Sequence, residues 1–295
     1  MNAKRKWNAL LMVVLLVGLV GCNKNQATSS PVAVEGLNDL GVIEVVSREE
    51  GSGTRSTFAA LADFEQKQEG QTQPDLTRED ARIVNNAEEV IEAVKANPSA
   101  IGYVSGGALQ DVEGVKSLSV NGISTEAQEG AYPLSRNFYL AYCGKLNDLE
   151  QDFLTYIHSE GQEIVGEAYI PVAKSNTFLS NQAEGTIRIT GSTSIAPLME
   201  QLAQAYMEIN PHAVIEVNAT DSTDGLTQAM SGSCDFGMSS RALKDYEMEL
   251  LDYEMIAEDN IAVIVNEENP IEDISLTDLR SIYVGDIETW QELNP

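Results

Sequence analysis

The stretch that decides the fold reads TIRITGSTSIAPLMEQLAQAY and spans residues 186–206. Residues 186–190 alternate between polar and apolar side chains, as in a β-strand with one buried face. After the loop at 191–194, apolar side chains follow the i, i+3, i+4 spacing of an amphipathic helix at Ile195, Leu198, Met199, Leu202, Ala203 and Tyr206. The sequence therefore predicts a strand, a small-residue loop and a helix, which together are a building unit of α/β folds.

Two further loops of Gly, Ser, Thr and Asp precede helical patterns, at residues 51–54 and 221–225. A helix start leaves N–H groups without intrahelical partners and carries roughly half a positive charge, so small residues there let donors converge on an anion. Taken singly, Gly51-Ser52-Gly53-Thr54 is most often a turn and a helix cap, and Ser222 and Asp224 can be ordinary caps. Three such starts in one chain predict one shared oxyanion site.

Strand and helix signals alternate along the rest of the chain. Short apolar runs typical of strands occur at 42–46, 100–104, 137–142, 214–217, 236–238 and 261–265, with helical spacing between them. Residues 173–184 are polar and lack a clear period, which is typical of a linker. The length of 295 residues leaves room for two domains of ordinary size. An α/β protein with two domains is expected.

The N-terminus has the features of an export signal. Lys4, Arg5 and Lys6 precede an apolar run from Ala9 to Val20, which is too short for an ordinary membrane span. The residues before Cys22 resemble a bacterial lipobox, which implies that Cys22 becomes the lipidated first residue of the mature chain. A plain cleaved signal is the alternative. Residues 1–22 are predicted as the signal peptide and 23–35 as a flexible tether, placing the protein on the extracytoplasmic face of the cell membrane.

The chain is strongly acidic. It carries 18 Lys and Arg residues against 46 Asp and Glu residues, a formal net charge of −28, and loss of the three basic residues of the signal makes this −31. Such a surface repels nucleic acid and anionic lipid heads, so neither is an expected partner. An anion site here must work through local hydrogen bonds. Cys143 and Cys234 could pair in an oxidising compartment.

Five segments of the chain carry recognisable motifs: residues 46–54, 191–197, 234–241, 260–266 and 282–290. Together they resemble one family, the phosphate-binding proteins of bacterial phosphate ABC transporters. The resemblance implies a type II periplasmic-binding-protein fold: two α/β lobes, joined by two hinge crossovers, that hold the ligand between them. It also implies a monomer that needs no cofactor, binds inorganic phosphate and delivers it to the membrane permease of an ABC transporter.

The order of the motifs differs from that family. The half from Val42 to Val172 precedes the half from Thr186 to Trp290, so the chain resembles a circularly permuted member; a truncated or rearranged gene is the alternative. The resemblance places crossovers near 138–142 and 262–266. It implies one continuous lobe at 145–260. The second lobe would be assembled from residues 36–140 with 265–295.

Ligand-binding residues are carried over from the family motifs position by position. The residues implied to bind phosphate are Arg48, Ser52, Gly53, Thr54, Thr193, Ser194, Ser222 and Asp235. Glu50 matches an acidic partner that would orient Arg48. An ionised carboxylate only accepts hydrogen bonds. Asp235 would therefore accept a hydrogen bond from the O–H of phosphate and disfavour sulfate, which carries no proton. Asp235 can equally be a strand-end turn residue, and Arg48 taken alone is most often a surface cation.

The sequence gives little support to the hypothesis that the protein is an enzyme. The two histidines, His158 and His212, belong to no recognisable acid–base set, and no metal site is expected. Cys234 is better explained as a small buried apolar residue than as a reactive thiol. The chain is therefore expected to be a binding protein and not an enzyme. A phosphate or other oxyanion sensor without transport is the second reading, and a phosphoesterase is the third.

Overall fold

The computed structural model describes residues 36–65, 75–127 and 131–293. The predicted signal peptide, the tether and Cys22 lie outside these ranges. Within the ranges described, no helix is both long and apolar enough to cross a membrane.

In the described part of residues 36–120, strands and helices mostly alternate, as the apolar pattern predicts at 42–46 and 100–104. Its elements are α1 (Leu37–Leu40), β1 (Glu44–Arg48), α2 (Gly53–Leu61), β2 (Arg82–Val84), α3 (Ala87–Ala96), β3 (Ala100–Ser105), the 3-10 helix η1 (Gly106–Leu109), β4 (Val115–Ser117) and β5 (Ser119–Val120).

The remaining elements continue this alternation. They are β6 (Ser135–Tyr142), α4 (Asp148–Ile157), α5 (Gly161–Ala168), β7 (Gly185–Ser192), α6 (Ala196–Ile209), β8 (Ala213–Thr220), α7 (Ser222–Ser231), β9 (Phe236–Ser239), α8 (Asp245–Met248), β10 (Asp252–Asn266), β11 (Asp273–Ile274), α9 (Leu276–Val284) and η2 (Trp290–Leu293). The predicted linker at 173–184 has no helix or strand, but it is held in place: Phe178 is buried, and Asn181 N–H donates to Asp152 Oδ1 at 3.0 Å.

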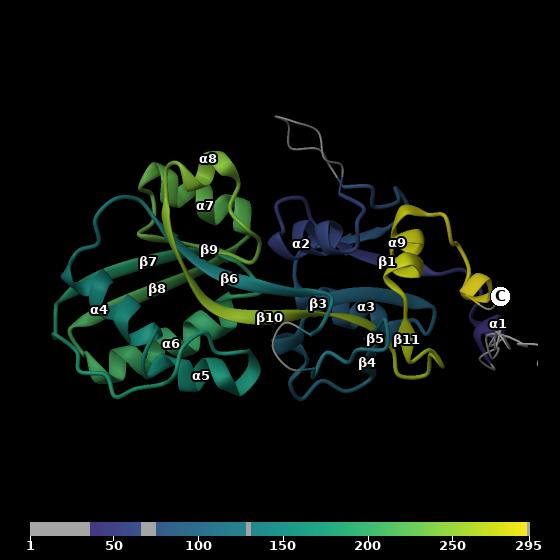
Figure 1. Ribbon diagram of the computed structural model, residues 1–295, viewed down its shortest axis with the longest axis horizontal. Helices are drawn as coiled ribbons and strands as arrows, with labels where there is room; N and C mark the ends of the chain where they lie inside the picture. The colour runs from purple at the N-terminus through teal and green to yellow at the C-terminus, as the bar shows by residue number, and fades with distance from the viewer. Residues whose placement is uncertain (1–35, 66–74, 128–130, 294–295) are drawn as a thin grey trace, which may run out of the picture. The chain divides into compact units, whose positions relative to one another are not determined.

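Nine of the strands form one mixed sheet in the order β2-β1-β3-β10-β6-β9-β7-β8, with β4 paired to β10, and β5 and β11 form a separate parallel pair. At one end β1 pairs in parallel with β2 and β3, and at the other end β7 pairs in parallel with β8 and β9. Between them β10 and β6 run antiparallel from Asp252↔Tyr142 to Asn260↔Ser135. Figure 1 shows these two long strands side by side, extending from one half of the fold into the other.

Buried apolar side chains gather in separate clusters toward the two ends of this strand pair. The first end, which we call the Arg48 lobe, comprises residues 36–65, 75–127, 131–134 and 261–293, with Phe58, Tyr103 and Trp290 in its larger core cluster. The second, the Ser222 lobe, comprises residues 138–257, with Phe153, Leu202 and Phe236 in its core. The predicted α/β class and the two-lobed fold with two crossover strands are confirmed; the exact lobe boundaries given above remain predictions.

The crossover strands pass between the cores slightly earlier than expected. Leu134 belongs to one core and Phe138 to the other, and the same change occurs between Ala257 and Ile261. The passage therefore lies at 135–137 and 258–260, not at 138–142 and 262–266. The residues of 138–142 and 262–265 belong to the cores themselves, whereas the passage carries mainly polar residues.

The two ends of the described chain lie together. Trp290 N–H donates to Gly41 C=O at 3.1 Å, Ile43 N–H donates to Glu288 C=O at 2.9 Å, and Val42 forms an antiparallel bridge with Thr289. Figure 1 shows α1 beside the C-terminal end. This proximity is what a circular permutation requires, because permutation is tolerated where termini are close and exposed. The permutation itself remains a prediction.

We expect a variant with the family order of segments to fold and bind as the present chain does. In it, Pro295 is joined to Leu40 by a short flexible link, and the chain is opened between Ser175 and Asn176, which are exposed. Loop closure entropy varies slowly with length, so the change should alter stability little. Circular dichroism and phosphate titration measure the outcome. A folded variant that binds nothing, beside a natural chain that binds, would contradict the proposed arrangement.

A buried ion pair fixes α8 after the end of β9. The guanidinium of Arg241 forms a two-pronged contact with Glu247, in which Nη1 and Nη2 donate to Oε2 and Oε1 at 2.7 and 2.8 Å. Both side chains are buried. Burial opposes ionisation of Glu247, but hydrogen bonds from Arg241 and Lys244 N–H prevail and lower the pKa of its carboxyl group.

Replacing this carboxylate should lower the stability of the fold in a pH-dependent way. We expect Glu247→Gln to reduce the free energy of unfolding by about 3–5 kcal/mol at pH 7, because it leaves the charge of Arg241 buried beside a neutral amide. Since the folded-state pKa is lowered, the stabilisation is present above the unfolded-state value near 4.5 and is lost as the pH falls through the folded-state pKa. Urea unfolding at pH 7 and pH 4 measures it, with exposed Glu249→Gln as the matched control. A pH-independent difference would contradict this account.

Candidate functional site

Hydroxyl groups of the Ser222 lobe meet where β7 and β9 end. These two strands are parallel, so their carboxyl ends lie at the same edge of the sheet. Ser192 Oγ donates to Ser240 Oγ at 2.9 Å, and Ser222 Oγ lies 3.3 Å from Ser240 Oγ. Ser240 N–H donates to Ser222 Oγ at 3.1 Å, and all three serines are buried. The starts of α6 and α7 therefore converge on one group of hydroxyls.

The Arg48 lobe supplies the other side of this group through the start of α2. Thr54 Oγ1 lies 2.8 Å from Ser194 Oγ, and both side chains are buried. Gly53 packs so closely that a Cβ atom on it would lie 2.3 Å from Ser222 Oγ. Ser52 caps α2 by accepting a hydrogen bond from Arg55 N–H, at 3.4 Å. We call this set, seven hydroxyl residues with the closely packed Gly53, the hydroxyl cluster: Ser52, Gly53, Thr54, Ser192, Thr193, Ser194, Ser222 and Ser240.

Arg48 joins the two lobes at the edge of the cluster. It ends β1, is 2 % exposed, and donates from Nη2 to Thr193 Oγ1 at 2.9 Å. Its Nε and Nη2 also donate to the two carboxylate oxygens of Glu49, both at 2.8 Å. The prediction that Glu50 orients Arg48 is thus wrong: Glu49 is the partner, and Glu50 is exposed in the turn before Gly51.

Aromatic packing holds the end of β1 in place. Tyr103 OH accepts from Arg48 N–H at 3.2 Å and lies 2.8 Å from Ser47 Oγ. Burial raises the pKa of Tyr103 to about 12, so the phenol stays protonated at neutral pH. The Tyr103 ring stacks on Phe58 of α2 with centroids 4.1 Å apart. One aromatic pair therefore fixes both Arg48 and the helix that carries Thr54.

Asp235 does not join the cluster. It precedes β9, and its Oδ2 accepts from Arg188 N–H at 2.6 Å while its own N–H donates to Arg188 C=O at 2.8 Å. In the β7–β9 register Ile189 pairs with Phe236 and Gly191 with Met238, so Asp235 lies at the opposite end of these strands from Ser192. The structure supports its reading as a strand-end residue, and the proton-acceptor role has no geometric basis.

We therefore expect Asp235→Asn to leave the ratio of phosphate to sulfate affinity unchanged, within about twofold. The substitution removes a charge that lies at the far end of β9, where an amide can still accept from Arg188 N–H. Isothermal titration with both anions gives the ratio. A marked loss of selectivity would restore Asp235 to the site.

The site also includes three residues that the sequence did not predict as its members: Ser192, Ser240 and Arg136. Ser192 lies in the motif segment 191–197 and Ser240 in the segment 234–241, but only the sheet register brings the ends of β7 and β9, and with them these serines, to the same edge. Arg136 of β6 donates from Nη1 to Thr54 Oγ1 at 2.7 Å and to Ser240 C=O at 3.3 Å. It belongs to none of the motifs, so no local signal identified it.

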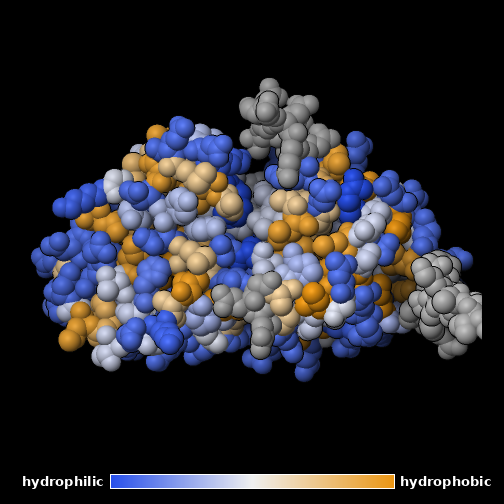
Figure 2. Space-filling view, viewed as in Figure 1, coloured by the Kyte–Doolittle hydropathy of each residue, from blue (hydrophilic) through white to orange (hydrophobic). Residues whose placement is uncertain are grey.

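Cavities border the cluster on two sides. One of about 890 Å³ reaches Thr193 and is lined by α3 of the Arg48 lobe and α6 of the Ser222 lobe. Another of about 360 Å³ lies between α2 and the segment after β9, where it is lined by Thr57 and Arg241. Figure 2 shows strongly hydrophilic residues in the hollow between these halves. Small polar ligands therefore have space to approach from solvent.

The cysteines are free in the structure. Cys143 is exposed and Cys234 is buried, so the predicted possibility of a disulfide between them is not realised. Burial raises the pKa of the Cys234 thiol to about 11, which makes it unreactive at neutral pH.

Known proteins resemble this chain along most of its length. The PBP superfamily domain matches residues 2–160 and 176–295. Phosphate-binding protein PstS 2 of Streptococcus pneumoniae serotype 4 is 37% identical over 282 residues, covering 94% of both chains. PstS 2 of Streptococcus agalactiae serotype V is 35% identical over 301 residues, covering 99% of both chains.

A solved structure agrees with these relatives. The crystal structure of a phosphate-binding protein of a phosphate ABC transporter from Streptococcus pneumoniae has a TM-score of 0.71 and 37% identity, covering 85% of this chain and 99% of that chain. With the two-lobed fold and the hydroxyl cluster between the lobes, these matches show that the chain belongs to the PBP superfamily and, within it, to the phosphate-binding proteins of bacterial phosphate ABC transporters.

Proposed function

We propose that this protein binds inorganic phosphate in the hydroxyl cluster and delivers it to the permease of an ABC transporter. The observation that carries the proposal is the meeting of Arg48 and three helix starts, α2, α6 and α7, at one buried group of hydroxyls. Such a group offers many hydrogen-bond donors to an oxyanion, and the helix starts add favourable dipoles. The names of the relatives support phosphate as the anion.

Local chemistry explains how a chain of net charge −28 can hold an anion. Arg48 is paired with Glu49, so the site relies on directed hydrogen bonds more than on a positive field. Hydroxyl groups both donate and accept, whereas sulfate at neutral pH only accepts. The serine and threonine oxygens can therefore accept a hydrogen bond from the O–H of hydrogen phosphate, and we expect phosphate to bind more tightly than sulfate.

Export, lipid attachment at Cys22 and a monomeric state belong to the same proposal. They rest on the sequence of residues 1–22 and on the family resemblance. A lipid anchor would hold the protein at the extracytoplasmic face of the membrane, next to the permease to which it delivers phosphate.

Isothermal titration with phosphate, sulfate and arsenate tests the proposal. Saturable binding of one phosphate per chain, tighter than sulfate, supports a phosphate-binding protein. Turnover of a phosphomonoester would instead favour a phosphoesterase. Phosphate uptake by cells with and without the gene separates a transport protein from a sensor, because only the former changes the uptake rate.

A further inference from the structure

An ion pair joins the two crossover strands at the base of the hydroxyl cluster. Arg136 of β6 and Asp259 of β10 are partners in the strand register. Arg136 Nε donates to Asp259 Oδ2 at 2.9 Å, and Nη2 lies 2.8 Å from the same oxygen. The two residues are 5 % and 2 % exposed. A charged pair is therefore buried where the chain passes from one lobe to the other.

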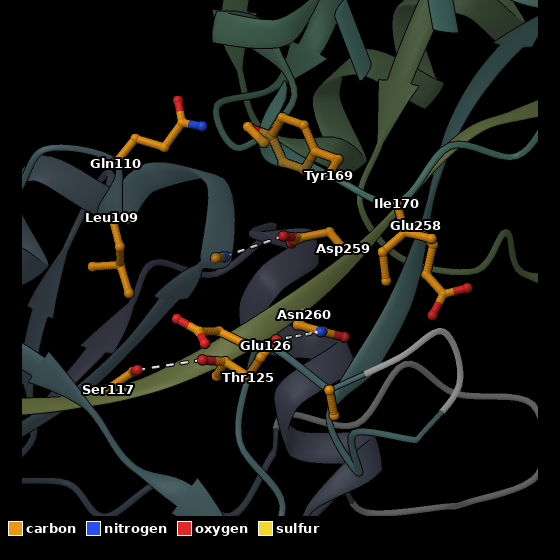
Figure 3. A pocket seen from close by; sticks show the side chains of 13 residues that line it. Leu109, Gln110, Ser117, Thr125, Glu126, Tyr169, Ile170, Glu258, Asp259 and Asn260 are labelled. Carbon is orange, nitrogen blue, oxygen red and sulfur yellow. Dashed lines mark hydrogen bonds between the residues drawn. The ribbon is translucent and has the colours of Figure 1, made fainter. Parts of the chain in front are cut away.

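Asp259 is fully occupied by its protein partners. Its Oδ1 accepts from Ser105 Oγ at 2.9 Å and from Gly106 N–H at 3.1 Å, while Oδ2 faces Arg136. Figure 3 shows the Asp259 carboxylate at one end of a hydrogen bond, which is the bond from Gly106 N–H. Burial raises the pKa of Asp259 and lowers that of Arg136, and each charge is retained by the other's attraction. The carboxylate is thus fixed by Ser105, Gly106 and Arg136.

Arg136, by contrast, has donor capacity to spare. Nη1 reaches Thr54 Oγ1 in the Arg48 lobe and Ser240 C=O in the Ser222 lobe. Nη2 is buried and forms an ion-pair contact with Asp259 Oδ2. Among the described residues, however, it donates no hydrogen bond, whereas Nε donates to the same oxygen. An unsatisfied buried N–H of a charged group is costly, and an oxyanion beside Thr54 would satisfy it.

We propose that Arg136 is a further anion-binding residue, which holds the phosphate from the base of the cleft while Arg48 holds it from the edge. This inference rests on the proposed function. Arg48, Arg136, Glu49 and Asp259 together carry no net charge, so the anion would add the only unbalanced charge to this set. Because Arg136 stands on a crossover strand and contacts both lobes, an anion bonded to it favours their closed arrangement.

A pair of variants isolates Arg136 in a folded background. Arg136→Met alone would leave Asp259 as a buried unpaired charge and could prevent folding. Asp259→Asn, in which Arg136 loses its counter-charge but keeps its hydrogen bonds to Thr54 Oγ1 and Ser240 C=O, is therefore compared with the double variant Arg136→Met/Asp259→Asn, in which both side chains are neutral. We expect the double variant to bind phosphate about 10- to 100-fold more weakly than Asp259→Asn, the range for loss of a charge-assisted hydrogen bond. Isothermal titration gives the dissociation constants, and circular dichroism shows that both are folded.

Equal affinities of these two variants would overturn the inference and make the Arg136–Asp259 pair purely structural. If either variant does not fold, Arg136→Lys provides the test: it keeps the charge but loses the fork, so at least about tenfold weaker binding is expected and an unchanged affinity refutes the role. Wild-type protein and Arg48→Lys are titrated alongside. A wild type that binds no phosphate refutes the proposed function as well, whereas normal wild-type binding with equal variant affinities refutes only this inference.

Discussion

Gly53→Ala is expected to weaken phosphate binding by about 100-fold or more while the protein stays folded. The added Cβ would lie 2.3 Å from Ser222 Oγ and 2.6 Å from Ser240 Oγ, so it would occupy the centre of the hydroxyl cluster and hold the lobes apart. Gly53 is the first residue of α2 and its backbone does not adopt a positive φ, so alanine suits the helix itself. Isothermal titration with phosphate and circular dichroism measure the two effects.

The matched control is Gly166→Ala, in the exposed face of α5. Its added Cβ would meet only Pro171 Cγ, at 3.4 Å, which is ordinary contact. This variant should bind phosphate like the wild type. If Gly53→Ala also bound like the wild type, the anion would have to lie elsewhere or the lobes would not need to meet at Ser222.

Arg48→Lys is expected to weaken phosphate binding by about 10- to 100-fold, or ~1–3 kcal/mol. The guanidinium of Arg48 contacts Glu49, Asn85 C=O and Thr193 at the same time, which a single ammonium group cannot reproduce. The positive charge is conserved, so the loss would report on directed hydrogen bonds. Titration against phosphate measures it, with Arg82→Lys on the exposed edge strand β2 as the control.

An unchanged affinity of Arg48→Lys would mean that Arg48 serves only to fix Glu49 and the end of β2. A similar loss in Arg82→Lys would point to a long-range charge effect in place of a local contact. The site geometry predicts weakened phosphate binding by Arg48→Lys together with wild-type phosphate affinity of Arg82→Lys.

Local patterns were sufficient to predict the elements that carry the site. The spacing of Ile195, Leu198 and Leu202 identified α6, and the small residues at 51–54 and 221–225 identified the starts of α2 and α7. These signals depend on residues close together in the chain, so a single sequence contains them. The meeting of the three loops followed from their shared chemistry.

Sequence alone could not show which end of a short strand faces the cleft. Asp235 and Ser240 flank β9, and at about 3.3 Å per residue they are well separated, at opposite ends of the strand. The register with β7 places Ser240 in the cluster and Asp235 beside Arg188. Position relative to a partner strand is a long-range property, which local residue types do not encode.

The same limit applies to Arg136 and Glu49. Arg136 is held in the site by its ion pair with Asp259, which is 123 positions away in the chain and opposite it in the sheet. Glu49 and Glu50 are adjacent acidic residues: Glu49 N–H donates to Val84 C=O and its carboxylate faces Arg48, whereas Glu50 is exposed in the turn that continues through Gly51. Pairing between distant strands and the exact path of a turn are fixed by the whole fold.

A crystal structure of the protein grown with phosphate tests the central claim most directly. The account predicts one phosphate between the lobes, within hydrogen-bond distance of Arg48, Thr54, Ser194 and Ser222. Phosphate bound away from these residues, or a cluster closed without it at saturating phosphate, would contradict the account.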